Sequence, residues 1–433
     1  MSLSRRMSAA VAGSAAVILA LSACAGEAGP PTFTPPPQVE GSLPAEMVAQ
    51  LEESVAHAVA ATGATGAIVG VWAPWSGSWV AGTGTQTRDS SAQVTTEQSF
   101  RIAQVTRLMT CDVLYALDSR GIVSKNASVS QYVSGVPDLK DVTLLDLCNG
   151  TAGIGEFRGT VADMMITNPE RQWGPLELAA YGVGKPRTEP RTTYRESDAA
   201  YMLLGLALER VSGKTAAELI DQYVAQPLEL SGTELPAPPA AAPAGTPLPG
   251  YHLNAVEGGV DCTAPVDITV LSSSLGFTDS GAVSTVEELG RYVRATAAQA
   301  LPASASSARW SAPLPVSDTA ELWHQATGGA HLVGPLIGQF GSVPGYATAA
   351  FSDPDSGFTV VVVLNSSAAG AAPAAYLAWE LAAIAAMAPA ASGQAAPEFA
   401  LPFTAETQRE KLAGLAVTCV EPPEEEPAEE TEE

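Results

Sequence analysis

The chain has 433 residues, of which 46% are hydrophobic and 15% are charged. This composition is too apolar for a disordered protein, and the length suffices for one large two-lobed domain or two ordinary ones. Acidic residues outnumber basic ones by 46 to 21, which gives a formal net charge of −25. Nucleic acid is therefore not an expected partner, because no surplus of basic residues is present to neutralise phosphates.

The N-terminus has the pattern of an export signal. Two arginines precede an apolar stretch over residues 9–21, which is too short to span a bilayer. The residues Leu-Ser-Ala-Cys at 21–24 resemble the lipobox of bacterial lipoproteins, in which the cysteine carries the lipid. We therefore predict a lipoprotein signal peptide over residues 1–23 and lipidation of Cys24, which would hold the exported protein on the outer face of the cytoplasmic membrane. The alternative is an ordinary signal peptide in which this cysteine is coincidental.

Composition divides the rest of the chain into three parts. Residues 24–44 are rich in proline and are predicted to form a tether. Residues 45–390 carry the periodic patterns of helices and strands and are predicted to form the folded domain. Residues 391–433 are predicted to be a C-terminal extension that ends in an acidic tail, with eight glutamates among the last 13 residues. Such a charge run usually solvates a terminus.

The first half of the domain begins with a helix and two strands. Apolar residues at helical spacing predict a helix over 45–62. A buried-strand run, a turn and a returning strand follow over 67–80. Residues 100–230 are mostly helical in pattern.

The second half returns to strands. A helix is expected over 285–298, and two strands over 347–364 flank a turn of the sequence Asp-Pro-Asp-Ser-Gly. An alanine-rich helix over 373–387 follows. Strands at both ends with helices between them predict a sheet domain into which a helical lobe, about 105–280, is inserted.

Five segments carry a resemblance to a known family. They are FRIAQVTRLMT at 100–110, TLLDLCNGTAGI at 143–154, YMLLGLALERVSG at 201–213, SGAVST at 280–285 and GSVPGY at 341–346. In this order they resemble the penicillin-recognising serine hydrolases, the family of class C β-lactamases, DD-peptidases and related esterases. The resemblance covers about 45–390. It implies an α+β fold, in which an antiparallel sheet is flanked by helices and an all-helical lobe is inserted.

The first catalytic motif of this family is replaced. The family places a serine and a lysine three residues apart on one helix, so that the neutral lysine takes the serine proton. The matching positions here are Gln104 and Arg107, and no Ser-x-x-Lys occurs elsewhere in the chain. A glutamine amide is no acyl-accepting nucleophile, and arginine, with a pKa above about 12, cannot act as a base near neutrality.

The second and third motifs are altered as well. The second, normally Tyr-x-Asn, falls at Glu196-Ser197-Asp198, where Asp198 can still accept hydrogen bonds. A count with a two-residue insertion would use Tyr194 instead. The third, Lys- or His-x-Gly, falls at Gln339-Phe340-Gly341 and keeps only the glycine, which allows close approach of a ligand to the strand.

The substitutions at the first two motifs are complementary in charge. The family fold places the tyrosine of the second motif within reach of the serine and lysine of the first. Here Glu196 stands at the tyrosine position and Arg107 at the lysine position. We therefore predict an Arg107–Glu196 ion pair across the former catalytic cleft, with the amide of Gln104 capping one end.

Export also bears on the remaining cysteines. Cys111, Cys148, Cys262 and Cys419 are an even number in an oxidising compartment, which predicts two disulfides; four buried thiols are the alternative. In the family the helices that carry Cys111 and Cys148 are neighbours, so the resemblance implies a Cys111–Cys148 bridge and leaves Cys262 for Cys419. No spacing typical of metal ligands occurs, and neither a metal nor a cofactor is expected.

Other chemistries find little support in the sequence. No Gly-x-Ser-x-Gly, His-Glu-x-x-His or P-loop is present. Thr106 lies within the altered first motif and is interpreted as a packing residue. The histidines have no candidate nucleophile beside them and are interpreted as core or surface residues; they are His57, His252, His324 and His331.

Three functional hypotheses follow. The leading one is a lipid-anchored protein of the cell envelope that has lost the serine chemistry and binds a peptidoglycan-like peptide or a protein partner in its cleft. The second is an active hydrolase of the β-lactamase, DD-peptidase or esterase type that uses atypical residues. The third is a structural module whose cleft is filled.

Overall fold

The computed structural model describes residues 37–88, 90–238, 241–301, 308–398 and 400–420. The predicted signal peptide, the lipidation site Cys24 and the acidic tail lie outside these residues, as does the predicted tether up to residue 36. Within the described ranges, no helix combines the length and the apolar character needed to cross a bilayer.

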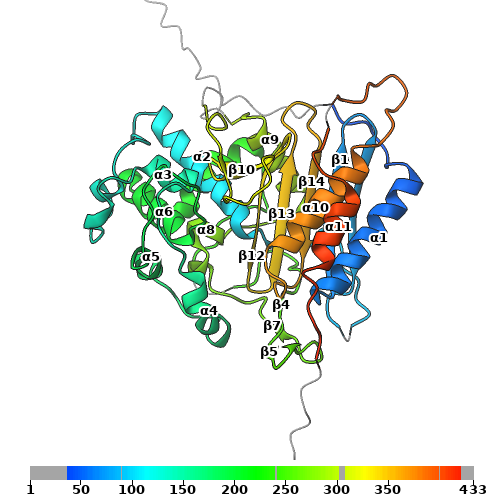
Figure 1. Ribbon diagram of the computed structural model, residues 1–433, viewed down its shortest axis with the longest axis horizontal. Helices are drawn as coiled ribbons and strands as arrows, with labels where there is room; N and C mark the ends of the chain where they lie inside the picture. Colours follow the sequence, from blue (N-terminus) through cyan, green and yellow to red (C-terminus); the bar gives the residue numbers. More distant parts are fainter. Residues whose placement is uncertain (1–36, 89, 239–240, 302–307, 399, 421–433) are drawn as a thin grey trace, which may run out of the picture.

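One lobe is built on an eight-stranded antiparallel sheet (Figure 1), in the order β2-β1-β14-β13-β12-β11-β10-β9. Strands β1 and β14 pair inside the sheet, with Ala67 opposite Leu364, so the two ends of the domain meet there. Both are continuous apolar runs and fully buried. The strands, in chain order, are β1 (Gly66–Ala73), β2 (Gly77–Gly84), β9 (Leu314–Pro315), β10 (His324–Thr327), β11 (Ala330–Val333), β12 (Leu336–Val343), β13 (Tyr346–Ser352) and β14 (Thr359–Leu364).

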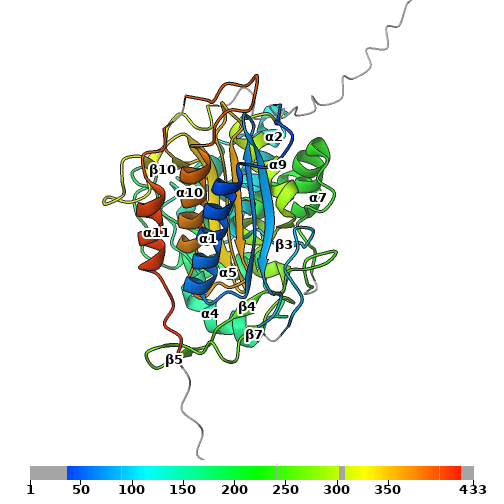
Figure 2. The ribbon, with the colours of Figure 1, turned by 90° about the vertical axis from the view of Figure 1, so that its right-hand side faces the viewer.

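Helices cover both faces of this sheet (Figures 1 and 2). On one face lie α1 (Ala45–Thr62), α10 (Ala372–Ala385) and α11 (Ala405–Ala413), which contact one another. On the other face lies α9 (Val286–Ala297), which contacts β1, β13 and β14. Each face therefore has its own hydrophobic core, separated by the sheet.

The second lobe is all-helical. The chain enters it after β3 (Phe100–Arg101) and leaves it before β8 (Val283–Ser284), two short strands that pair with each other at the boundary. The helices of this lobe are α2 (Thr106–Ser119), α3 (Leu144–Asn149), α4 (Arg158–Thr167), α5 (Pro175–Val183), α6 (Asp198–Ser212), α7 (Ala216–Ile220) and α8 (Phe277–Ser280). Two small two-stranded antiparallel sheets lie near the exit: β4 (Tyr251–His252) with β7 (Val266–Asp267), and, between them in the chain, the hairpin of β5 (Ala255–Val256) and β6 (Gly259–Val260).

Two disulfides join segments that are distant in the sequence. Cys111 of α2 is bonded to Cys148 of α3, with a Cα–Cα distance of 5.7 Å. Cys262, after β6, is bonded to Cys419, with a Cα–Cα distance of 5.4 Å. The structure thus has the two pairings that the sequence analysis expects.

The C-terminal extension packs on the sheet lobe through α11, and its residues Thr418 and Val420 then pair with Val260 of β6. Leu412 of α11 is fully buried, and the Arg409 guanidinium lies 2.8 Å from Glu380 of α10 and 3.1 Å from Glu53 of α1. The sequence analysis had no helix here. The segment is polar on most sides, and its apolar contacts are supplied by other elements, so no periodic pattern marks it.

The long elements agree closely with their predictions. The predicted helix over 45–62 has the same bounds as α1. The two strands predicted over 347–364 form β13 and β14, and the helix predicted over 373–387 forms α10. The hairpin turn forms where expected, with the Asp353 carboxylate accepting from the Ser356 N–H at 2.8 Å. Strands β9, β10 and β11 were not predicted, because they are only two to four residues long and partly polar.

Candidate functional site

A cleft with a volume of about 500 Å³ lies where the helical lobe meets strand β12. Five of the six positions matched to the family motifs line it, while Gln339 does not. Residues from the starts of α2, α4 and α6 meet residues of β11 and β12 around this space: Gln104, Arg107, Glu156, Arg158, Gly159, Glu196, Asp198, His331, Phe340, Gly341, Ser342 and Ala371.

Gln104 occupies the nucleophile position and is 7% exposed. It lies on a single 3₁₀ turn (Ala103–Val105) between β3 and α2. A Cβ atom on Gly341 would lie 1.6 Å from the Gln104 Oε1 atom, so the glycine of the third motif leaves room for this side chain. Gln104 therefore fills the strip along β12 that the family keeps free for its substrate.

The predicted capping role of Gln104 is wrong. Its Oε1 atom is buried and accepts no hydrogen bond from any residue that the structure describes. Tyr194 instead donates a hydrogen bond to Glu196, and Asp279 accepts one from Arg107. The side chain is directed at Gly341, because the absent Cβ makes that surface the closest one available.

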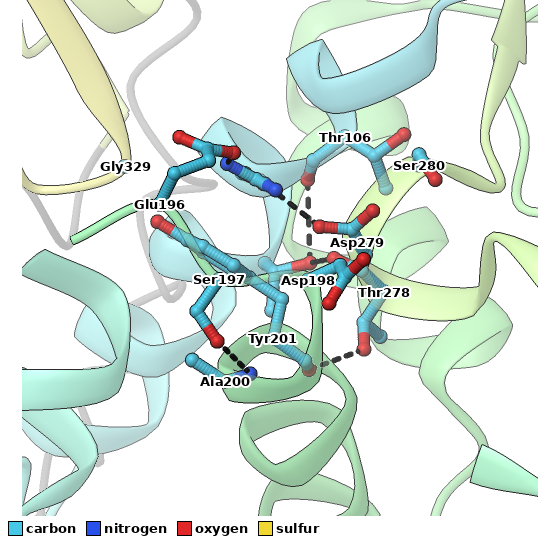
Figure 3. Close-up of polar contacts among 12 residues, drawn as sticks. Thr106, Glu196, Ser197, Asp198, Ala200, Tyr201, Thr278, Asp279, Ser280 and Gly329 are labelled. Carbon is cyan, nitrogen blue, oxygen red and sulfur yellow. Dashed lines mark hydrogen bonds and ion pairs between the residues drawn. The ribbon is translucent and has the colours of Figure 1, made fainter. Parts of the chain in front are cut away.

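Arg107, the second residue of α2, forms the predicted ion pair with Glu196. Its side chain is 3% exposed and its guanidinium lies 4.7 Å from the ring centre of Tyr201. A second carboxylate, Asp279, accepts from the Arg107 Nε atom at 2.8 Å, and Figure 3 shows Glu196 and Asp279 on two separate segments. Burial by itself lowers the pKa of Arg107, but the charges of Asp279 and Glu196 raise it well above its ordinary value. This side chain is a permanent cation.

Asp279, on α8, was missed by the sequence analysis. Its side chain is fully buried and also pairs with Arg158, with 3.0 Å between Nη2 and Oδ2. Arg158 in turn donates to the Ser280 hydroxyl at 3.2 Å and to the backbone carbonyl of Ser342 on β12. The two arginines thus share one buried carboxylate. Asp279 directly precedes the segment 280–285 of the resemblance, which is the one signal that pointed to this region.

Glu196 keeps an open side toward the cleft. Its side chain is 42% exposed, and its Oε2 atom accepts from the Tyr194 hydroxyl at 2.6 Å. Burial opposes ionisation, yet the Arg107 charge and the Tyr194 hydrogen bond lower the pKa of Glu196 to about 2. Burial and the Glu196 charge raise the pKa of Tyr194 well above its ordinary value. The alternative motif tyrosine therefore reaches the site, but as a hydrogen-bond donor to a carboxylate.

Asp198 organises the start of α4. It begins α6 and is 3% exposed, and its two oxygens accept from the N–H groups of Phe157 at 2.7 Å and Arg158 at 2.9 Å. Burial and the charge of Asp279 raise the pKa of Asp198 above its ordinary value. By holding these two N–H groups, Asp198 positions Arg158 and its neighbour Glu156 at the cleft.

Gln339 is turned away from the cleft. Its Nε2 atom donates to the Gly329 carbonyl at 2.8 Å, and its Oε1 atom accepts from the Phe340 N–H at 2.8 Å. The family's third-motif cation is thus replaced by a residue that ties β12 to the turn between β10 and β11. Thr106, interpreted as a packing residue, is fully buried and donates to the Ala103 carbonyl at 2.8 Å.

His331 reaches the cleft from the opposite side. Its Nδ1 atom lies 2.9 Å from Nε2 of His324, and its ring packs 4.7 Å from that of Phe340. Burial, followed by the charge of its neighbour, lowers the pKa of His331 to about 3, and burial lowers that of His324 to about 4. Both rings are uncharged at neutral pH, which agrees with their interpretation as core residues.

The site lacks the parts of an acyl-transfer centre within the described chain. Ser342 is the hydroxyl residue on the cleft lining, and no hydrogen bond links its side chain to a histidine, lysine or carboxylate. The same described residues contain no group of three or more His, Cys, Asp or Glu side chains able to hold a metal ion.

Comparison with known proteins places this geometry in a family. Among curated proteins, the esterase/beta-lactamase LipL of Mycobacterium tuberculosis is 29% identical over 174 residues, which is 40% of this chain and 35% of LipL. The D-alanyl-D-alanine-carboxypeptidase/endopeptidase AmpH of Escherichia coli is 30% identical over 142 residues, which is 31% of this chain and 36% of AmpH. The chain thus matches about a third of the length of these relatives.

Solved structures agree on the fold. The D-stereospecific amidohydrolase from Streptomyces sp. has a TM-score of 0.63 at 20% identity, covering 73% of this chain and 94% of that one. The penicillin-binding protein homologue from Pyrococcus abyssi has a TM-score of 0.62 at 20% identity, covering 78% and 76%. The sequence model of the Beta-lactamase family matches residues 51–383, and the protein therefore belongs to the beta-lactamase family.

Proposed function

We propose that this protein is a catalytically inactive member of the beta-lactamase family that binds a peptidoglycan-like peptide in its cleft. The observation that carries the proposal is Gln104, whose amide stands at the nucleophile position and lies against Gly341. An amide in that place neither accepts an acyl group nor leaves the strand free for a bond to be cleaved there.

The charges around Gln104 support loss of the base. A proton acceptor at the lysine position has to be neutral near pH 7, whereas Arg107 is held charged by Glu196 and Asp279. A space of about 500 Å³ nevertheless remains beside it, which is within the usual size of a small-molecule pocket. A cleft that retains this space but has neither the family's nucleophile nor its base is suited to binding.

The class of ligand is suggested by the relatives. AmpH is by name a D-alanyl-D-alanine carboxypeptidase, and the Streptomyces protein is a D-stereospecific amidohydrolase. Short peptides that contain D-amino acids are therefore the first candidates for this cleft. An envelope protein that presents a peptide segment to the same cleft is the second candidate.

We further propose that lipidated Cys24 holds the protein on the outer face of the cytoplasmic membrane, where such peptides occur. Metabolic labelling of the bacterial host with an alkyne fatty acid tests this placement. The full chain is expected to take up the label and to fractionate with membranes. The variant Cys24→Ala is expected to do neither, and equal labelling of the two would contradict the proposal.

The loss of catalysis is tested with a fluorescent penicillin. The full-length protein, solubilised in detergent, is incubated with the probe, denatured, and examined by gel fluorescence and intact mass. No covalent adduct is expected, while an active penicillin-binding protein in the same reaction serves as the positive control. An adduct would show that an atypical nucleophile is at work and would contradict the proposal.

A further inference from the structure

The charged groups on the cleft lining do not balance. The lining carries three acids, Glu156, Glu196 and Asp198, and two cations. The cations, Arg107 and Arg158, are each paired with the buried Asp279. Arg107 also binds Glu196, and Arg158 donates to Ser280 and to the backbone of β12. Both guanidiniums are thus already neutralised by carboxylates, although Arg158 remains 28% exposed.

Two of the three carboxylates, in contrast, are open to a ligand. Glu196 is 42% exposed and accepts one hydrogen bond on each oxygen, so further lone pairs face the cleft. Glu156 is exposed and has no hydrogen bond or ion pair with any described residue. Both glutamates line the same cleft. Partial burial and the charge of Glu196 raise the pKa of Glu156, while the charges of Arg107, Arg158 and Lys185 lower it by less.

A third acceptor is independent of these acids. The Oε1 atom of Gln104 is buried and unpaired among the described residues, and the side chain lines the same cleft. This oxygen lies against Gly341, so it reaches a ligand when the side chain turns toward the cleft, and a ligand N–H there would supply the hydrogen bond that the oxygen lacks. Two open carboxylates and one amide whose oxygen lacks a donor thus belong to the same cleft lining.

We propose that the cleft binds a primary ammonium group of its ligand, held between Glu156 and Glu196 with the Gln104 carbonyl as a further acceptor. An ammonium group has three N–H donors and no acceptor, which complements this arrangement. A ligand carboxylate finds no unpaired cation among the residues that line the cleft and is repelled by both glutamates, although the charge of Lys185 also acts on Glu156. This inference rests on the proposed binding function and specifies the chemistry of its ligand.

Two sources of such an ammonium group exist in a peptide. One is the α-amino end of the chain, and the other is the side chain of a diamino acid such as lysine. The tripeptide Lys-D-Ala-D-Ala carries both, and acetylation removes either or both without changing the rest. Its C-terminal amide removes the carboxylate instead.

Binding of these peptides to the full-length protein in detergent is measured by calorimetry. The doubly acetylated tripeptide is expected to bind at least about tenfold more weakly than the free one, since a hydrogen-bonded charge is worth roughly 1.5 kcal/mol or more. The two singly acetylated peptides identify which amine is bound. The C-terminal amide is expected to bind at least as well as the free acid.

Variants of the protein locate the binding group. Glu156→Gln is expected to weaken binding of the free tripeptide about tenfold and to leave folding unchanged, because this side chain has no partner within the described chain. Affinity for the unmodified protein is expected to fall with added salt, and less so for the variant. Glu257→Gln, on the exposed turn between β5 and β6, is the matched control and is expected to change nothing.

The outcomes separate this inference from the function on which it rests. Equal binding of the free and doubly acetylated tripeptides would overturn the ammonium site and leave the binding function intact. Unchanged affinity in Glu156→Gln would likewise overturn it. A covalent penicillin adduct would overturn the proposed inactivity alone, and failure of every peptide to bind would overturn both.

Discussion

Two of the buried arginines, Arg309 and Arg107, pair with carboxylates in sites that differ in charge balance and in access to solvent. Behind α2, Arg309 pairs with Asp112, and both side chains are almost fully buried, at 0% and 1% exposure. Arg309 also donates to the carbonyls of Gly328 and Leu108, while Tyr292 donates to Asp112 at 2.7 Å. One cation meets one anion, and the remaining donors are satisfied.

In the cleft, Arg107 meets two carboxylates, and one of them is 42% exposed. The second carboxylate beside Arg107 and the solvent exposure of Glu196 distinguish this site from the buried Arg309–Asp112 pair. Buried ion pairs by themselves are poor indicators of function, because many serve only the fold. The comparison shows that charge imbalance beside a cavity is the more useful signal.

The largest expected effect on stability comes from breaking the buried Arg309–Asp112 pair. Asp112→Asn removes the charge partner of Arg309 and leaves a cation in a dry interior, so we expect a loss of about 3–5 kcal/mol in the free energy of unfolding. Urea denaturation followed by circular dichroism measures it. A loss below about 1 kcal/mol would show that water reaches this pair and that the comparison does not hold.

A somewhat smaller effect is expected at Asp279. In Asp279→Asn, Arg107 keeps Glu196 as a partner, but Arg158 loses its ion pair with a buried carboxylate. We expect a loss of about 2–3 kcal/mol by the same measurement. A neutral or stabilising effect would mean that the repulsion between Asp279 and Asp198 outweighs both of its ion pairs.

Of these three acidic residues, Glu196 should contribute least to stability at pH 7 and most to the dependence of stability on pH. Glu196→Gln retains the shape of the side chain, and because the pair is partly solvated, we expect a loss of at most about 1 kcal/mol at pH 7. The native pKa of about 2 lies below the ordinary 4.5, so the ionised carboxylate stabilises the fold above pH 4.5.

That stabilisation is lost as the pH falls from 4.5 to about 2. The difference in unfolding free energy between the native protein and Glu196→Gln should therefore shrink over this interval. Denaturation series at several pH values, with Glu257→Gln as the control, measure the difference. A gap that widens toward low pH would show that the folded state raises the pKa of Glu196.

The sequence predicts the parts of this site that are local or complementary in charge. Glu196 and Arg107 could be paired because the family fold places their positions together and their charges are opposite. Asp279 lies 172 residues from Arg107 and has no motif of its own, so its contact depends on how α8 packs against α2. The same holds for Arg158, which reaches the site only because Asp198 fixes the start of α4.

The direction of Gln104 could not be predicted for a similar reason. Its family counterpart is a short side chain, and a longer amide has several possible partners at that position. The Gln104 side chain takes its direction from the empty space over Gly341, which exists only once strand β12 is packed. The fold, by contrast, was predictable over most of its length, because long apolar strands and helices carry their periodicity in every few residues.

The smallest expected effect is the absence of any gain in chemistry when the first motif is restored. Gln104→Ser supplies a hydroxyl beside a permanent cation, with no base to take its proton. Adding Arg107→Lys does not remedy this, since Asp279 and Glu196 raise the pKa of a cation at this position and keep a lysine charged. Groups of an acyl-transfer centre act as a unit, so partial restoration should yield no fluorescent penicillin adduct with either variant. An adduct with the single variant would show that a base is present in the cleft. One that forms only with the double variant would show that the two carboxylates fail to hold lysine in its charged form.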